Sequence, residues 1–212
     1  MKNVQLYIIV AVALCLIIPG CKRKQPQNGG TGAQIQVEQK ADVKAPDFAL
    51  ENYDGTKVSL GDYKGKIVVL EWFNYECPFS KYSWETARNT ANLAEKYAGR
   101  GVVFLAINST AHATPEKNKE TAEAAKLDYP ILDDRSGRVG RAYGAKTTPH
   151  MFVIDKEGYI VYDGAIDNAP MGKAPDAGKI NYVDQAISEL LAGKPVSIPK
   201  TDPYGCSVKY AE

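Results

Sequence analysis

Cys77 is the residue whose setting in this sequence most favours chemistry. It lies between a hydrophobic run and Pro78, in the stretch LEWFNYECPFSKYSWE (70–85). Proline is well tolerated at the first position of a helix, so we expect Cys77 to cap a helix that begins at Pro78. Unpaired backbone amides and the positive end of the helix dipole would then face the sulfur and favour the thiolate, the nucleophilic form of cysteine.

The alternative for Cys77 is the usual fate of a free cysteine, which is burial as a small apolar residue. A junction between a core strand and a helix normally lies at one lip of a sheet, so we expect the Cys77 sulfur to be exposed there. Thiol chemistry of this kind usually has a second cysteine three positions on, but Ser80 occupies that position. Any partner thiol must therefore come from elsewhere in the chain.

Glu71 is the second candidate for chemistry. It sits inside the apolar run IVVLEWF, where a carboxylate is costly unless it is paired or neutral. We expect it to lie beneath the helix start with a raised pKa, which would let it accept and return protons as thiols and disulfides interchange. The alternative is that Glu71 points to solvent or pairs with a lysine.

The start of the chain predicts export. Residues 4–18 form an apolar run that is too short for a typical membrane span and fits a secretory signal. The run ends in LIIPGC, which resembles the lipobox of bacterial lipoproteins, whose cysteine becomes the acylated first residue. We therefore predict a signal peptide over 1–20 and a lipidated Cys21, the alternative being an ordinary signal peptide. Residues 22–44 are polar and lack apolar periodicity, as in a flexible tether to the 45–212 domain.

Cys206 becomes the candidate partner of Cys77. The chain has four cysteines, of which Cys15 would leave with the signal and Cys21 would carry lipid, in a compartment that permits disulfides. Cys206 follows a proline-rich, extended segment, which makes it a resolving thiol on a mobile arm. The alternatives are a permanent disulfide that pins the tail, or two sulfurs that never meet.

Composition and the remaining motifs exclude several other functions. Loss of Lys2 with the signal would lower the 26 basic residues by one and balance the 25 acidic ones, which gives no argument for nucleic-acid binding. His112 and His150 have no metal-ligand spacing with the cysteines, and no phosphate-binding glycine loop or Ser-His-Asp set is present. We therefore expect neither a metal nor an organic cofactor.

The pattern of elements predicts an α/β fold that positions Cys77 and Glu71. A strand or hairpin entrance (45–66) precedes a buried strand (66–73), a helix from Pro78 with one apolar stripe, and a second buried strand (100–108). A helix capped by Thr114, a hairpin (148–167) and a helix ending at Gly193 follow. Two right-handed crossovers would give a parallel core with an antiparallel edge, and reactive groups gather at the carboxyl ends of its strands.

Three stretches carry a resemblance to a known family. Residues 45–79, the hairpin TTPHMFVIDKEGYIVYDGAID (147–167) and YGCSVKY (204–210) resemble the redoxin branch of the thioredoxin superfamily. That branch includes the alkyl hydroperoxide reductase/thiol-specific antioxidant (AhpC/TSA) family and the membrane-tethered, TlpA-like thiol-disulfide oxidoreductases. The resemblance implies a thioredoxin-like fold with a central mixed sheet between helices. It also implies a nucleophilic Cys77, a buried acid at Glu71, and a cis proline at Thr148-Pro149 that shapes a groove for an extended substrate.

Two departures from the family pattern bear on whether the protein exchanges disulfides or reduces peroxide. Ser80 prevents the short-loop disulfide of thioredoxins. Peroxide-reducing relatives have a threonine or serine, a proline and an arginine where this sequence has Asn74, Leu70 and Pro149, so the peroxide-activating set is incomplete. Asn74 retains a hydrogen-bond donor.

We therefore predict a membrane-anchored thiol-disulfide oxidoreductase that faces the periplasm or extracytoplasmic space. Its partners would be a protein disulfide and an external thiol donor of electrons. The alternatives are a thiol peroxidase that uses Cys77 on a peroxide substrate, and a redoxin-fold lipoprotein that binds without catalysis.

Overall fold

The computed structural model describes residues 43–212. The predicted signal peptide, Cys21 and nearly all of the predicted tether lie outside these residues. Within the described part of the chain, each helix is too short or too polar to span a bilayer.

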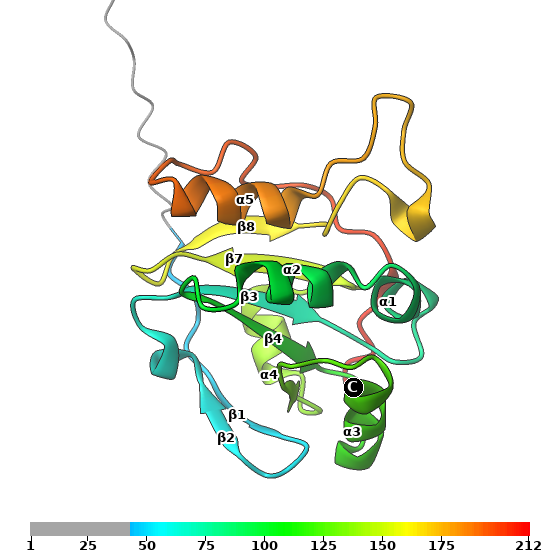
Figure 1. Cartoon of the computed structure of the whole chain (residues 1–212). Coiled ribbons are helices and arrows are strands. Elements are labelled where there is room, and N and C mark those ends of the chain that lie inside the picture. Colours follow the sequence, from blue (N-terminus) through cyan, green and yellow to red (C-terminus); the bar gives the residue numbers. More distant parts are fainter. Residues whose placement is uncertain (1–42) are drawn as a thin grey trace, which may run out of the picture. The chain divides into compact units, whose positions relative to one another are not determined.

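A seven-stranded mixed sheet forms the centre of the domain, in the order β2-β1-β5-β4-β3-β7-β8 (Figure 1). Its strands are β1 (Ala49–Asn52), β2 (Lys57–Ser59), β3 (Ile67–Trp72), β4 (Val102–Asn108), β5 (Ile131–Asp133), β7 (His150–Ile154) and β8 (Ile160–Gly164). Strands β3, β4 and β5 run parallel, whereas β7 and β1 pair antiparallel with β3 and β5. The predicted parallel core with an antiparallel hairpin edge is therefore confirmed.

Helices cover both faces of this sheet, which confirms the expected fold class. The helices are α1 (Pro78–Lys81), α2 (Asn89–Tyr97), α3 (Pro115–Ala124), α4 (Arg138–Tyr143) and α5 (Tyr182–Leu191), with 3-10 turns at Leu60–Tyr63 and Pro170–Gly172 and a π-helical turn at Tyr82–Thr86. Side chains of β3 alternate between the two layers, because successive residues of a strand point to opposite faces. Val69 and Phe73 pack with α2, α3 and α5, and Leu70 and Trp72 pack with α4 and the β1–β2 hairpin.

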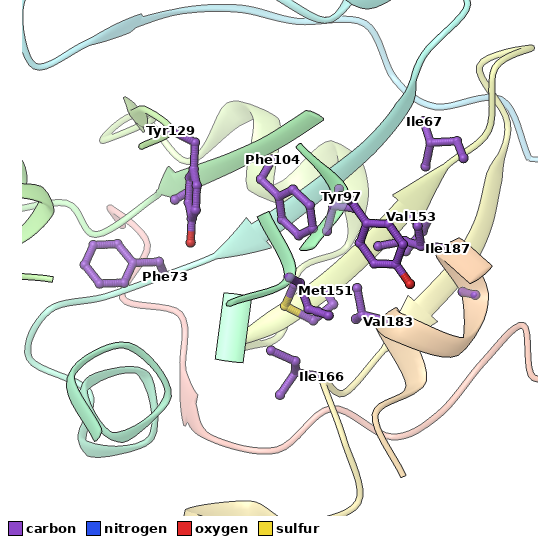
Figure 2. Close-up of a cluster of buried hydrophobic side chains, with 14 of the residues drawn as sticks. Ile67, Phe73, Tyr97, Phe104, Tyr129, Met151, Val153, Ile166, Val183 and Ile187 are labelled. Atoms are coloured by element: carbon purple, nitrogen blue, oxygen red, sulfur yellow. The ribbon is translucent and has the colours of Figure 1, made fainter. Parts of the chain in front are cut away.

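The larger of the two hydrophobic clusters lies between β3, β4 and β7 on one side and α2, α3 and α5 on the other, and Figure 2 shows part of it. Val183 and Ile187 of α5 face Val153 of β7 there, and all three are fully buried. Glu71 lies in the same alternating row of β3 as Val69, so its carboxyl group points into this apolar layer rather than to solvent.

The single helix predicted after Cys77 is broken in the structure. The π-helical turn Tyr82–Thr86 separates α1 from α2, and Arg88 adopts a left-handed conformation with φ of 48° immediately before α2. A π turn has more residues than the 3.6 of an α-helix, so the positions beyond it leave the predicted stripe. The sequence predicted one apolar stripe of Trp84, Ala87, Ala91, Ala94 and Ala98. Trp84 and Ala91 are buried as predicted, but Ala98 is exposed, so the prediction was wrong for the end of the stripe.

Sequence analysis missed β5 and α4, which are only three and six residues long. The start of α4 is held by Asp134, a buried carboxylate directly after β5. Asp134 accepts hydrogen bonds from the Ser109 hydroxyl at 2.6 Å and from the Gly140 amide at 2.9 Å. Because Ser109 also accepts from the indole of Trp72 at 3.0 Å, α4 is connected through this carboxylate to the central strand β3.

We expect Asp134→Ala to lower the free energy of unfolding by about 3 kcal/mol, because it leaves the buried Ser109 hydroxyl and the amides at the start of α4 without an acceptor. Equilibrium urea unfolding checks this value. Asp128→Ala, which removes an exposed carboxylate from a nearby loop, is the matched control and should change stability by less than about 0.5 kcal/mol. Equal stability of the two variants would contradict the role of Asp134.

Candidate active site

Cys77 caps α1, as predicted. It has an extended backbone with φ of −79° and ψ of 120°, and Pro78 occupies the first helical position. The turn that leads to Cys77 is closed by Asn74, whose carbonyl accepts from the Cys77 amide at 3.1 Å and whose side-chain oxygen accepts from the Glu76 amide at 2.8 Å. Asn74 therefore shapes the loop by accepting hydrogen bonds, whereas the sequence suggested a donor.

The expected exposure of Cys77 at an open lip of the sheet was wrong. Its relative accessibility is 1%. The cover is the C-terminal tail (residues 194–212), which passes α5 and β8 and crosses close to α1 (Figure 1). Residues Cys206–Ser207 form a short strand, β9, that pairs antiparallel with β6 (Thr147–Thr148). The burial of Cys77 thus comes from a distant segment of the chain.

This pairing brings the two remaining cysteines together. Cys206 lies directly opposite Thr148, and the Thr148 carbonyl accepts from the Cys77 thiol at 2.8 Å. The Thr148-Pro149 peptide bond is cis, as the family resemblance implied. Both cysteines are free thiols, and Cys206 lies close enough to Cys77 to influence the pKa of that thiol.

The surroundings shift the pKa values of the two thiols in opposite directions. Burial by itself would raise the pKa of Cys77, but the Thr148 hydroxyl, the Cys206 side chain and the backbone amide of Ser80 favour the thiolate more strongly, and the pKa is lowered. Burial and the neighbouring Cys77 sulfur raise the pKa of Cys206 to about 11. The first proton therefore leaves Cys77, and Cys206 stays protonated and stabilises the thiolate.

Glu71 is buried beneath this region, as predicted. Its relative accessibility is 2%, and one carboxylate oxygen accepts from the Trp84 indole at 2.7 Å, while the other has no hydrogen-bond partner among residues 43–212. Burial raises the pKa of Glu71 to about 7, although the Trp84 hydrogen bond opposes the shift. The predicted alternatives, a solvent-facing or lysine-paired carboxylate, are wrong.

Ser80 and the two histidines complete the set of residues considered from the sequence. Ser80 is fully buried, with its amide directed at the Cys77 sulfur and its hydroxyl without a partner. His150 lies in β7, accepts from the Lys146 amide and contacts Asp163 at 2.7 Å, so its ring joins structural hydrogen bonds. His112 forms an exposed pair with Glu76 at 2.8 Å.

The residues that hold the tail were missed by sequence analysis. Before Cys206, the Thr201 hydroxyl accepts from the Ala165 amide at 2.9 Å and Tyr204 donates to Asp167 at 2.6 Å. After Cys206, Tyr210 donates to the Ala145 carbonyl at 2.8 Å. The predicted mobile arm is therefore docked on both sides of Cys206. Local sequence gives no signal for such contacts, because their partners are more than thirty residues away.

Comparison with known proteins identifies the family. The AhpC/TSA family pattern matches residues 41–163, which is more than half of the chain. The chain belongs to the AhpC/TSA family. The C-terminal tail lies beyond the matched residues.

Relatives with assigned activities are thiol-disulfide oxidoreductases. The chain is 29% identical over 128 residues to thiol-disulfide oxidoreductase ResA of Bacillus thuringiensis, covering 59% of this chain and 71% of that protein. It is 36% identical over 117 residues to ResA of Geobacillus thermodenitrificans, covering 55% of this chain and 64% of that protein. These similarities confirm the predicted enzyme class, a thiol-disulfide oxidoreductase.

Solved structures share the fold over most of the described chain. A conserved, uncharacterized protein of Geobacillus kaustophilus superposes with a TM-score of 0.70 at 32% identity and covers 82% of this chain and 94% of its own. The exposed lipoprotein thioredoxin of Streptococcus pneumoniae superposes with a TM-score of 0.50 at 28% identity and covers 70% of this chain and 99% of its own. The thioredoxin-like fold is thereby confirmed.

We expect Cys206→Ala to raise the pKa of Cys77, because the thiolate loses a hydrogen-bond donor. Ultraviolet thiolate absorbance, followed while pH is raised, measures the shift. Ser207→Ala changes an exposed neighbour in the same strand and should leave the titration of Cys77 in place. An unchanged titration in Cys206→Ala would show that the two sulfurs do not interact.

We expect Glu71→Gln to alter how stability depends on pH. Folding raises the pKa of Glu71 above its unfolded value of 4.5, so its favourable contribution is complete below pH 4.5 and is lost as pH rises through about 7. Between pH 5 and pH 8, the free energy of unfolding of the native protein should fall by about 2 kcal/mol relative to that of Glu71→Gln, as measured by urea unfolding. The exposed control Glu123→Gln should follow the native protein, and parallel curves for all three proteins would contradict the raised pKa.

Proposed function

We propose that the protein exchanges disulfides through the Cys77–Cys206 pair, with Cys77 as the attacking thiolate and Cys206 as the resolving thiol. The observation that carries this proposal is the β6–β9 pairing, which sets Cys206 opposite Thr148, the residue whose carbonyl accepts from the Cys77 thiol. The opposite pKa shifts support the assignment of roles, because the more acidic thiol is the one ready to attack at neutral pH.

The exchange takes two steps. The Cys77 thiolate attacks one sulfur of a substrate disulfide, forms a mixed disulfide with it and releases the other substrate sulfur as a thiolate, which takes up a proton. Cys206 then loses its proton and attacks the Cys77 sulfur, which releases the second substrate thiol and leaves a Cys77–Cys206 disulfide. Two electrons pass to the substrate, and an external dithiol must return them to the enzyme.

Glu71 would manage a proton in this exchange. A carboxyl group with a pKa of about 7 is divided between its two forms near neutral pH, which suits a group that both accepts and returns protons. Its oxygen without a hydrogen-bond partner leaves one position free for that transfer. Pro78 and Asn74 would fix the loop that carries Cys77, and Thr148 and Pro149 would shape the edge along which the substrate docks.

We further propose that the enzyme is exported and held at a bacterial membrane by lipid on Cys21, facing the periplasm or extracytoplasmic space. The LIIPGC motif and the apolar run before it support this location. The similarity to the exposed lipoprotein thioredoxin of Streptococcus pneumoniae supports it independently. The substrate would then be a disulfide of another exported protein.

Two single substitutions test the assigned roles. Cys77→Ser should reduce the reduction of insulin disulfides to the background rate, because no nucleophile remains. Cys206→Ser should instead accumulate a mixed disulfide between Cys77 and the substrate, visible as a stable adduct by intact-protein mass spectrometry, because nothing resolves it. Full turnover by Cys206→Ser would contradict the resolving role, and rapid hydrogen peroxide consumption without insulin reduction would favour the peroxidase.

A further inference from the structure

The C-terminal tail closes the position at which a substrate must reach Cys77. β9 fills the hydrogen-bonding edge of β6, and Cys77 is 1% exposed beneath it. A disulfide of another protein cannot approach a sulfur in that state, because attack requires the three sulfur atoms to come together. The proposed exchange therefore needs the tail to leave β6 first.

Contacts hold the tail on both sides of β9. On the N-terminal side, Thr201 pairs with the backbone of Asp163, and the Tyr204 hydroxyl reaches the buried carboxylate of Asp167. On the C-terminal side, the Val208 amide donates to Lys146 at 3.1 Å. Tyr204 and Val208 also pack against the two hydrophobic clusters, but both side chains stay partly exposed. The tail is thus held by a few hydrogen bonds and two half-buried side chains, and a segment held in this way can open without global unfolding.

Gly205 is the residue that allows the tail to lie so close. Its φ of 137° is a conformation that favours glycine, and a Cβ placed there would clash with the Thr148 carbonyl oxygen. This contact is with backbone, which cannot rotate away. Another segment that pairs with β6 in the same register as β9 would also have no room for a Cβ at the residue before its cysteine. That residue must therefore be glycine.

We propose that the β6 edge is a docking site for an extended protein segment in which glycine directly precedes a cysteine, and that residues Thr201–Ser207 occupy it as an internal competitor. The partner segment displaces the tail to reach Cys77, and the return of the tail brings Cys206 back to resolve the mixed disulfide. The return of Cys206 to resolve the mixed disulfide rests on the proposed function. The competition between the tail and a partner segment for β6 does not depend on disulfide exchange.

The first test measures access to Cys77. In a Cys206→Ser background, the added substitution Gly205→Ala should speed modification of Cys77 by a maleimide carrying polyethylene glycol by at least about tenfold, since the displaced tail exposes the sulfur. Modification is located by peptide mass mapping. Circular dichroism verifies folding, and Tyr204→Phe, which loosens the tail without a clash, is the second variant and should give a smaller increase. Equal, rapid modification of Cys77 in all of these proteins would overturn the proposal.

The second test measures docking in trans. A fluorescent peptide with the sequence of residues 200–210 and Cys206→Ser should bind the Gly205→Ala protein but not the native protein, whose own tail is present at a high effective concentration. The same peptide with Gly205→Ala is the matched control and should not bind either protein. Equal binding of both peptides, or none to the Gly205→Ala protein, would overturn the proposed recognition. Neither readout depends on disulfide exchange, so a failed Cys206 role would leave both results intact.

Discussion

The pairing of β9 with β6 is the contact on which the account of this protein depends. It joins the end of the chain to the cis-proline loop, covers Cys77 and places Cys206 over it. Without this pairing, Cys77 would be a lone thiol at a helix start, because Ser80 takes the place of a nearby second cysteine. With it, two cysteines that are far apart in the sequence lie together, as the proposed redox pair requires.

The same contact explains why the pKa values of Cys77 and Cys206 shift in opposite directions. A buried sulfur is normally less acidic than an exposed one, yet the donors gathered around Cys77 reverse that tendency. One of those donors is the Cys206 thiol, whose own pKa rises in consequence. The difference in pKa between the two thiols is therefore a property of the pair, produced by tertiary packing and not by either residue alone.

Sequence patterns predicted the elements that are long or locally specified. The apolar run of β3, the cysteine-proline helix start and the hairpin of β7 and β8 were all expected. β5 and α4 were too short to give a periodic signal, and the break after α1 depends on a π turn that apolar spacing does not reveal. The cover over Cys77 could not be predicted, since hydrogen bonds of Thr201 and Tyr204 to residues distant in sequence create it. A glycine directly before Cys206 was the one local hint of close backbone approach.

The most direct measurement is a disulfide map of the full protein after mild oxidation and again after mild reduction. If β9 holds Cys206 over Cys77, a single intramolecular 77–206 linkage should form first and disappear with a mild dithiol while the domain stays folded. The account is contradicted if Cys77 instead forms intermolecular disulfides or sulfinic acid while Cys206 remains a free thiol.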